Sequence, residues 1–434
     1  MSDLYIMSWL LCLSTSIIFM LSIYRWRYLL VKPSMMFALF FHVQVQYPSA
    51  IYWPKIELFL TSPFPFFVLA QIFPPLLILG SICLGQKSAL IVYQRIVSFP
   101  ISAYKVTARF LLPLAFISLI ILSWYLYVVP WKDTGLYAVI FQPSDAAIAR
   151  EQSLKLLSDQ SLKYTISLFN STLAPILACL IGLRALYAWQ TKAFLKALFF
   201  LSLILPILLT VSLSGARAPS AMILLAVIFT ILITKGLPIN PIKIAFLAAI
   251  VLIIPGLISL LRNAADFNLS SIIEYYTDIF DRAIGQGMIV DAQWHLEYVN
   301  RFGFWGIAGI EKLAGLFDVN PINILNVVGK YYRPDALDSI SANTSTIFLY
   351  YSCFGWWALP LCLVLGWILD LALIGYRLIK SSILIVCVAV SGIAAGNLAH
   401  TGYTTIFITH GFLSVLMLCI ILDELLKSYK KILH

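Results

Sequence analysis

Residues that could handle a charged substrate are concentrated between positions 262 and 342 of this 434-residue chain. Ten of the nineteen acidic residues lie there, together with Arg262, Arg282, Arg301 and Arg333. Arginine stays charged and can donate two hydrogen bonds to one phosphate group. A carboxylate can accept a proton from a hydroxyl group. Residues 262 to 342, which we call the polar island, are therefore the first place to look for chemistry.

A further arginine, Arg217, lies on a short hairpin outside the polar island. It follows Gly215, which leaves the backbone room for close approach, and precedes Pro219, which suits the first turn of a helix. Arg262 repeats this placement at the end of another apolar run. Two arginines so placed favour a shared anionic ligand such as a phosphorylated lipid head. The alternative is that each arginine only extends to water.

Candidate bases occur on two stretches of the polar island. Glu274, Asp278 and Asp281 follow i, i+4, i+7 spacing, which places them on one face of an amphipathic helix that also carries Arg282. A carboxylate on this face can accept a proton from a sugar hydroxyl, and Arg282 can join a phosphate clamp. The alternative interpretation is a solvated helix face with an ordinary local ion pair.

The second stretch contains Asp291 and His295. Their i, i+4 spacing predicts that the carboxylate orients the imidazole, which makes either group a candidate base or hydrogen-bond donor. Trp294 and Tyr298 beside them supply ring faces of the kind that stack on sugars. A surface histidine without a catalytic role is the alternative interpretation.

The end of the polar island combines charge, amide, hydroxyl and aromatic groups. Arg333, Asn343, Thr344 and Tyr350 are the candidate substrate-binding residues, since sugars require mixed polar and aromatic walls. Helix caps and interfacial aromatic anchors are the alternatives. The seven cysteines lie in or beside apolar runs without a CxxC pair, and the five histidines lack metal-ligand spacing. We therefore predict neither a metal site nor a cofactor.

The rest of the chain consists mainly of apolar runs. It is 61% hydrophobic and 11% charged, with a mean hydropathy of +0.94. Continuous runs of about 18 to 25 residues are long enough to cross a bilayer as helices and lack the alternation of barrel strands. We expect an all-α polytopic membrane protein, a single integral membrane domain over residues 1 to 434. About eleven spans are predicted near residues 5–23, 34–53, 64–84, 110–130, 164–183, 197–213, 219–234, 244–261, 345–375, 382–402 and 404–423.

Basic residues set the expected orientation. Seventeen of the 29 fall in alternate connections, whereas sixteen of the nineteen acids fall in the others. The positive-inside rule then places the N-terminus outside and the C-terminus in the cytoplasm. The polar island becomes one large extracytoplasmic loop, and residues 131 to 163 form a second outward connection. Cytoplasmic anchors against anionic lipid account for the net charge of +10, so no nucleic-acid partner is expected.

Three of these features resemble the Wzy-type oligosaccharide repeat-unit polymerases, the O-antigen polymerase family. They are the Gly-x-Arg hairpin at Gly215 to Arg217, the large loop from Arg262, and the Asn-Thr-x-Thr…Tyr-Tyr…Phe-Gly segment from Asn343 to Gly355. The resemblance covers about residues 200 to 375. It implies an architecture similar to lipid-sugar glycosyltransferases of the GT-C class, in the bacterial inner membrane, with the active site facing the periplasm.

The resemblance also implies an activity. Such an enzyme transfers a growing glycan from undecaprenyl pyrophosphate to the next lipid-linked repeat unit without a metal, and a chain-length regulator protein is a partner that the family allows. Arg217, Arg262 and Arg282 would converge on the pyrophosphate. The base would be one of four residues: Glu274, Asp281, Asp291 or His295.

Three other functions stay open at this point. An O-antigen ligase, which moves the finished glycan to a lipid core, shares the architecture. A lipid-linked sugar flippase or other transporter is disfavoured because the spans are nearly free of charge and show no repeated halves. A membrane scaffold without activity is the third alternative.

Overall fold

The computed structural model describes residues 3–104, 108–142, 146–157, 160–215, 217–234, 277, 286–334, 342–400, 407 and 411–433. Within these ranges every regular element is an α-, 3₁₀- or π-helix, so the predicted all-helical architecture is confirmed there. Six helical stretches of the described chain are long and apolar enough to cross a membrane: Asp3–Arg25, Pro63–Cys83, Phe110–Val128, Tyr164–Gln190, Phe194–Ser212 and Thr346–Leu378. The architecture is that of a helical membrane protein.

These six stretches coincide with six of the predicted spans. Two further predictions coincide with the shorter apolar helices Pro219–Thr234 and Ile383–Ala399. The prediction at 244–261 lies outside the described residues. The prediction at 404–423 lies partly outside them, and its described part belongs to α27 (Phe412–Leu433).

The predicted span at 34–53 is broken into short pieces. It contains α2 (Pro33–Phe41), a π segment (His42–Gln46) and α3 (Tyr47–Ile51), and α4 (Trp53–Phe59) follows. Proline causes part of this interruption, because it lacks an N–H group and its ring clashes with the carbonyl four residues earlier. The wider π turn just before Pro48 accommodates that clash.

Proline follows two other π segments of the described chain at the same distance. The segment Val68–Ile72 precedes Pro74, and the segment Phe169–Leu173 precedes Pro175. The first of these pairs with the His42–Gln46 segment through two buried glutamines. Gln46 Nε2 donates to the carbonyl of Gln71, and Gln71 Nε2 donates to the carbonyl of Gln46, both at 3.1 Å. This exchange satisfies polar groups that would cost several kcal/mol if left unpaired in an apolar core.

The predicted span at 345–375 is long enough to be a tilted helix, a broken helix or two pieces with a bend at Gly355, and the structure has the bend at Gly355. Helix α22 (Thr346–Phe354) ends at this glycine, and α23 (Ala358–Ile368) and α24 (Ala372–Leu378) follow after short 3₁₀ turns. Gly355 has a φ of +59°, and a side chain there would meet the ring of Phe304 at 2.9 Å. Only glycine suits both constraints.

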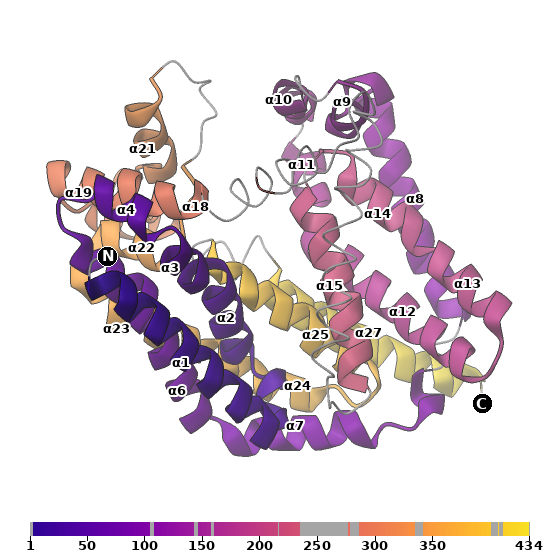
Figure 1. Cartoon of the computed structure of the whole chain (residues 1–434). Coiled ribbons are helices and arrows are strands. Elements are labelled where there is room, and N and C mark those ends of the chain that lie inside the picture. Colours follow the sequence, from indigo (N-terminus) through magenta and orange to yellow (C-terminus); the bar gives the residue numbers. More distant parts are fainter. Residues whose placement is uncertain are drawn as a thin grey trace, which may run out of the picture.

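The core of the bundle surrounds α25 (Ile383–Gly396), of which every residue is buried. This helix contacts α2, α12 (Ala174–Gln190), α15 (Arg217–Thr234) and α27. In Figure 1, α18 (Gln286–Ile289), α19 (Glu297–Phe302) and α21 (Ile324–Tyr332) lie at the same end as α9 (Gly135–Phe141) and α10 (Ala146–Leu156). Helix α7 (Gln86–Ser98) runs across the opposite end. The described parts of the two predicted outward connections therefore share one end.

A buried ion pair joins three segments near α7. Lys32 Nζ lies 3.0 Å from Asp370 Oδ2, with the two side chains 0% and 9% exposed. The ammonium group also donates to the carbonyls of Ser81 and Leu84 at the end of α6 (Phe73–Cys83). Asp370 accepts two further hydrogen bonds, from the backbone N–H of Ser34 at 3.0 Å and from its hydroxyl at 2.8 Å. Each charge is thus compensated by the other and by neighbouring dipoles.

We predict that Asp370→Asn destabilises the protein by about 3–5 kcal/mol, because it leaves the Lys32 charge buried without a counter-charge. The double variant Lys32→Met/Asp370→Asn should be less destabilised than the single variant. Thermal unfolding of the purified proteins in detergent measures both effects. Equal melting temperatures for wild type and Asp370→Asn would show that the pair does not hold these segments.

Candidate active site

The candidate site lies where the polar island meets the membrane helices. A π segment (Val290–Leu296) joins α18 to α19 and carries both Asp291 and His295. The extended residues 342–345 run beside it and lead into α22. Hydrogen bonds in a π-helix run from i to i+5, so residues at i and i+4 do not align as in an α-helix. Both side chains instead turn to the same neighbouring segment.

Asp291 holds the start of α22. Its Oδ1 atom accepts hydrogen bonds from the hydroxyl of Thr344 and from the backbone N–H of Ser345, the latter at 3.1 Å. The carboxyl group is 1% exposed. Thr344 was expected as a substrate-binding or capping residue, and its described hydroxyl bond goes to Asp291. Ser345 is the N-cap residue of α22.

His295 is bound to the same segment. Its Nε2 atom lies 2.9 Å from the carbonyl oxygen of Ala342, and because a carbonyl only accepts, Nε2 must carry the proton. Nδ1 is buried and has no hydrogen-bond partner among the described residues. The hydrogen bonds described for Asp291 and His295 thus go to residues 342–345, whereas the sequence predicted that the carboxylate orients the imidazole.

Burial shifts the pKa of both groups toward the neutral form. Desolvation raises the pKa of Asp291 to about 7, against a smaller opposite effect of the hydrogen bonds from Thr344 and Ser345. Desolvation lowers the pKa of His295 to about 4. At neutral pH the imidazole is therefore uncharged, and the carboxyl group titrates near the pH at which a general base works best.

Glu297 is a third buried polar group here, and the sequence did not single it out. Its Oε1 atom accepts hydrogen bonds from the backbone N–H of Thr61 at 2.8 Å and from the Thr61 hydroxyl at 3.0 Å. This contact ties α19 to the turn between α4 and α5 (Pro63–Phe67). No local pattern around Thr61 indicates a partner 236 residues away. The polar island is thus attached to two separate membrane segments.

Aromatic rings beside the site pack on one another. Trp294 stacks on Tyr332, with ring centroids 5.3 Å apart, and the guanidinium group of Arg333 lies 6.0 Å from the Trp294 ring. Tyr298 stacks on Trp305 at 5.4 Å. One face of each predicted sugar-stacking ring is therefore covered by another ring. Arg333 itself is exposed at the end of α21.

The other predicted site residues are placed as follows. Asn343 is exposed beside Thr344, and Tyr350 is buried within α22. Arg217 is the first residue of α15, and its backbone alone is described. The remaining four residues lie outside the described residues: Arg262, Glu274, Asp281 and Arg282.

The hairpin before Arg217 is fixed by backbone contact with the second outward connection. Gly215 has a φ of +75°, and a side chain there would meet the backbone of Gly135 at 2.8 Å. The N–H of Leu136 donates to the carbonyl of Leu213 at 3.0 Å. Close approach of the backbone was predicted at Gly215, and in the structure the approaching group is the backbone of Gly135 in α9. Pro219 lies in the first turn of α15, as predicted.

The described residues contain no group of three or more histidines, cysteines and acids that could hold a metal ion. Comparisons with protein-family models, curated proteins and solved structures find no match for this chain. The site's chemistry therefore has to be argued from its own geometry.

The opposite pKa shifts of Asp291 and His295 predict an unusual pH dependence of stability. Between about pH 4 and 6.5, the folded pair holds one proton on Asp291, and the unfolded pair holds one proton on His295. Their contributions to the change of the unfolding free energy with pH therefore cancel in the wild type. In Asp291→Asn only His295 remains, so stability should fall as the pH falls below 6.5. In His295→Gln only Asp291 remains, so stability should fall as the pH rises from 4 to 7.

The slope expected for each variant, relative to wild type, is about 1.4 kcal/mol per pH unit. Thermal unfolding of the three purified proteins across this range measures it. Parallel profiles for all three would show that neither group has a shifted pKa.

Proposed function

We propose that this protein is a glycosyltransferase of the bacterial inner membrane that polymerises oligosaccharide repeat units linked to undecaprenyl pyrophosphate. The proposal includes about eleven spans and a periplasmic active site in the polar island. The observation that carries it is the contact between Asp291 and residues 344 and 345. It brings the best-placed described base together with the Asn-Thr-x-Thr segment that resembles the polymerase family.

The chemistry assigns Asp291 the role of base. The hydroxyl oxygen of the acceptor sugar attacks the anomeric carbon of the donor, and the bond from that carbon to the pyrophosphate oxygen breaks. The hydroxyl proton passes to the Asp291 carboxylate. With a pKa of about 7, a large fraction of the Asp291 side chains is ionised at neutral pH and can accept this proton. The same pKa makes the carboxylate basic enough to hold the proton. His295, with a pKa of about 4, is the weaker base of the two.

The departing pyrophosphate needs positive charge, and Arg217, Arg262 and Arg282 are proposed to supply it. Support for Arg217 comes from its position at the start of α15, on a hairpin packed against α9. Figure 1 places α9 at the end of the molecule that also carries α18 and α19. An arginine at a helix start there can meet a lipid-linked pyrophosphate at the membrane surface.

We predict that Asp291→Asn abolishes long polymer, with transfer at least about 100-fold slower, since the amide cannot accept the proton. The measurement is the chain-length ladder of surface polysaccharide in a deletion strain complemented with each variant at equal membrane abundance. Asp318→Asn is the matched control, because Asp318 is an exposed acid of the same island. A normal ladder from Asp291→Asn would refute the assignment.

The deletion strain itself separates the classes of function. Single repeat units on the lipid core indicate a polymerase. Absence of attached glycan indicates a ligase, and precursor trapped on the inner leaflet indicates a flippase. Either of the last two outcomes would overturn the proposed polymerase activity.

Arg217→Ala should also shorten the ladder strongly, because the leaving pyrophosphate loses a charged partner. Arg217→Lys should restore the ladder length only in part, since an ammonium group cannot donate two parallel hydrogen bonds to two phosphate oxygens. Arg150→Ala is the control, an exposed arginine of α10 at the same end. Unchanged polymer length in Arg217→Ala would remove this residue from the site.

A further inference from the structure

Helix α7 is buried on one side and exposes a mixed apolar and polar face on the other, where Lys87 and Gln94 lie among apolar side chains. Ala89, Val92 and Ile96 are buried, and the helix contacts the 3₁₀ turn Arg27–Val31, α15 and α24. Leu90, Val97 and their neighbour Ile91 are 38%, 46% and 36% exposed. Figure 1 shows α7 running across the end opposite the polar island, crosswise to α15. A crosswise helix whose exposed face mixes apolar side chains with charged and amide groups is typical of one that lies in the membrane surface.

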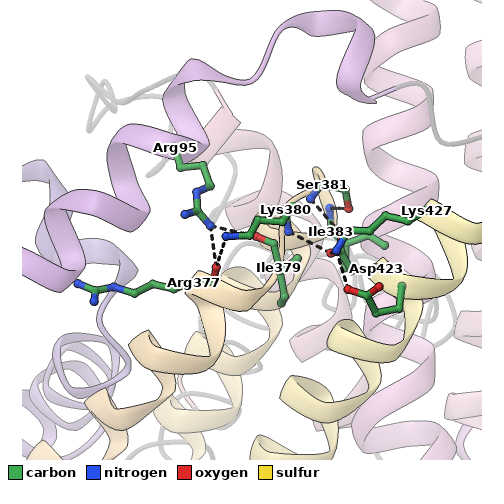
Figure 2. A network of polar contacts seen from close by, with 9 residues as sticks. Arg95, Arg377, Ile379, Lys380, Ser381, Ile383, Asp423 and Lys427 are labelled. Atoms are coloured by element: carbon green, nitrogen blue, oxygen red, sulfur yellow. Dashed lines mark hydrogen bonds and ion pairs between the residues drawn. The ribbon is translucent and has the colours of Figure 1, made fainter.

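Three acids of the described chain near this end are engaged in ion pairs. The sequence places only Asp370, Asp423 and Glu424 among the predicted inward connections and helix ends. Asp370 pairs with Lys32. Asp423 and Glu424 both pair with Lys427, at 2.7 and 2.6 Å. Asp423 also accepts the backbone N–H groups of Lys380 and Ser381, as Figure 2 shows.

Three basic residues at the junction of α7 and α24 bond only to neutral groups. Arg95 Nη1 donates to the carbonyls of Arg377 and Ile379, both at 3.1 Å (Figure 2). Arg377 Nη2 donates to the Ser88 hydroxyl at 2.9 Å, and its Nε is buried without a partner among the described residues. Lys380 Nζ donates to the carbonyl of Arg377 at 3.1 Å. No ion pair of the described chain neutralises these three charges.

We propose that Arg95, Arg377 and Lys380, which we call the basic strip, bind the headgroup phosphates of anionic phospholipids while α7 lies in the membrane surface. Carbonyl and hydroxyl partners orient the cations without cancelling their charge, so they can bind an anion from outside the chain. The exposed apolar residues Leu90, Ile91 and Val97 lie on the helix that carries Arg95. A lipid supplies a phosphate and an acyl chain together, whereas free phosphate supplies only the first.

The test compares purified full-length protein in nanodiscs of phosphatidylcholine alone and with increasing phosphatidylglycerol. Bound phosphatidylglycerol is counted by native mass spectrometry, and the melting temperature is measured at low and high salt. Wild type should retain phosphatidylglycerol and melt at a higher temperature in its presence, with the gain reduced by salt. Arg377→Gln/Lys380→Gln should bind it about 30-fold more weakly, at about fivefold for each lost charge.

Arg95 is kept in this variant because its two carbonyl bonds hold the turn after α24. Lys132→Gln/Arg150→Gln removes two charges at the opposite end and should behave as wild type. Equal retention by wild type and the strip variant would overturn the proposal, as would an equal melting shift from inorganic phosphate alone. If the strip variant fails to fold, the wild-type measurements still test the proposal. Equal melting temperatures and no retained phosphatidylglycerol in the two lipid compositions would refute lipid binding at the basic strip.

Discussion

The described part of the polar island depends on one buried carboxylate that has no cationic partner among its described contacts. Asp291 accepts hydrogen bonds from Thr344 and Ser345, so it fixes the point at which the chain re-enters the membrane domain as α22. The next residue, Thr346, continues this attachment by donating to the carbonyl of Leu398 beside α25. Glu297 provides the second attachment, through Thr61. Removing the first contact would leave residues 342–345 joined to the π segment mainly through His295.

The same contact explains why Asp291 is a candidate base. Donors from a hydroxyl group and a backbone N–H stabilise the carboxylate, but they do not offset the cost of removing its charge from water. The carboxyl group therefore has a pKa of about 7, so its protonated and ionised forms are both populated at neutral pH. Asp370, at the opposite end, has an ammonium group and two donors around it. One acid is arranged to exchange a proton, and the other is arranged to hold three segments together.

Hydropathy and glycine placement predicted much of the fold. Continuous apolar runs located the long helices, and Gly355 marked the bend because only glycine adopts that backbone conformation beside Phe304. The break at residues 34–53 had a visible cause in Pro48 and the polar residues His42 and Gln46. Its pairing did not, since the π segment exchanges hydrogen bonds with Gln71, and a local pattern does not contain a partner 25 residues away.

The sequence selected candidate residues for the site but did not predict their contacts. Asp291 and His295 were selected by type and spacing, and that spacing assumed an α-helix. The π geometry and the neighbouring residues 342–345 direct both side chains elsewhere. Glu297 was missed because its partner, Thr61, is remote in sequence. Burial also decides the pKa values, and no local pattern records how completely distant segments cover a carboxylate.

The most direct test of Asp291 as the base is the pH dependence of polymer formation by purified protein, reconstituted with repeat units linked to undecaprenyl pyrophosphate. The wild-type rate should rise with pH through an apparent pKa near 7, because the carboxylate is the active form. Asp291→Asn, with lipid-linked substrate still bound, should be at least about 100-fold slower and lack that rise. An Asp291→Asn rate equal to wild type, with the same pH profile, would contradict the account.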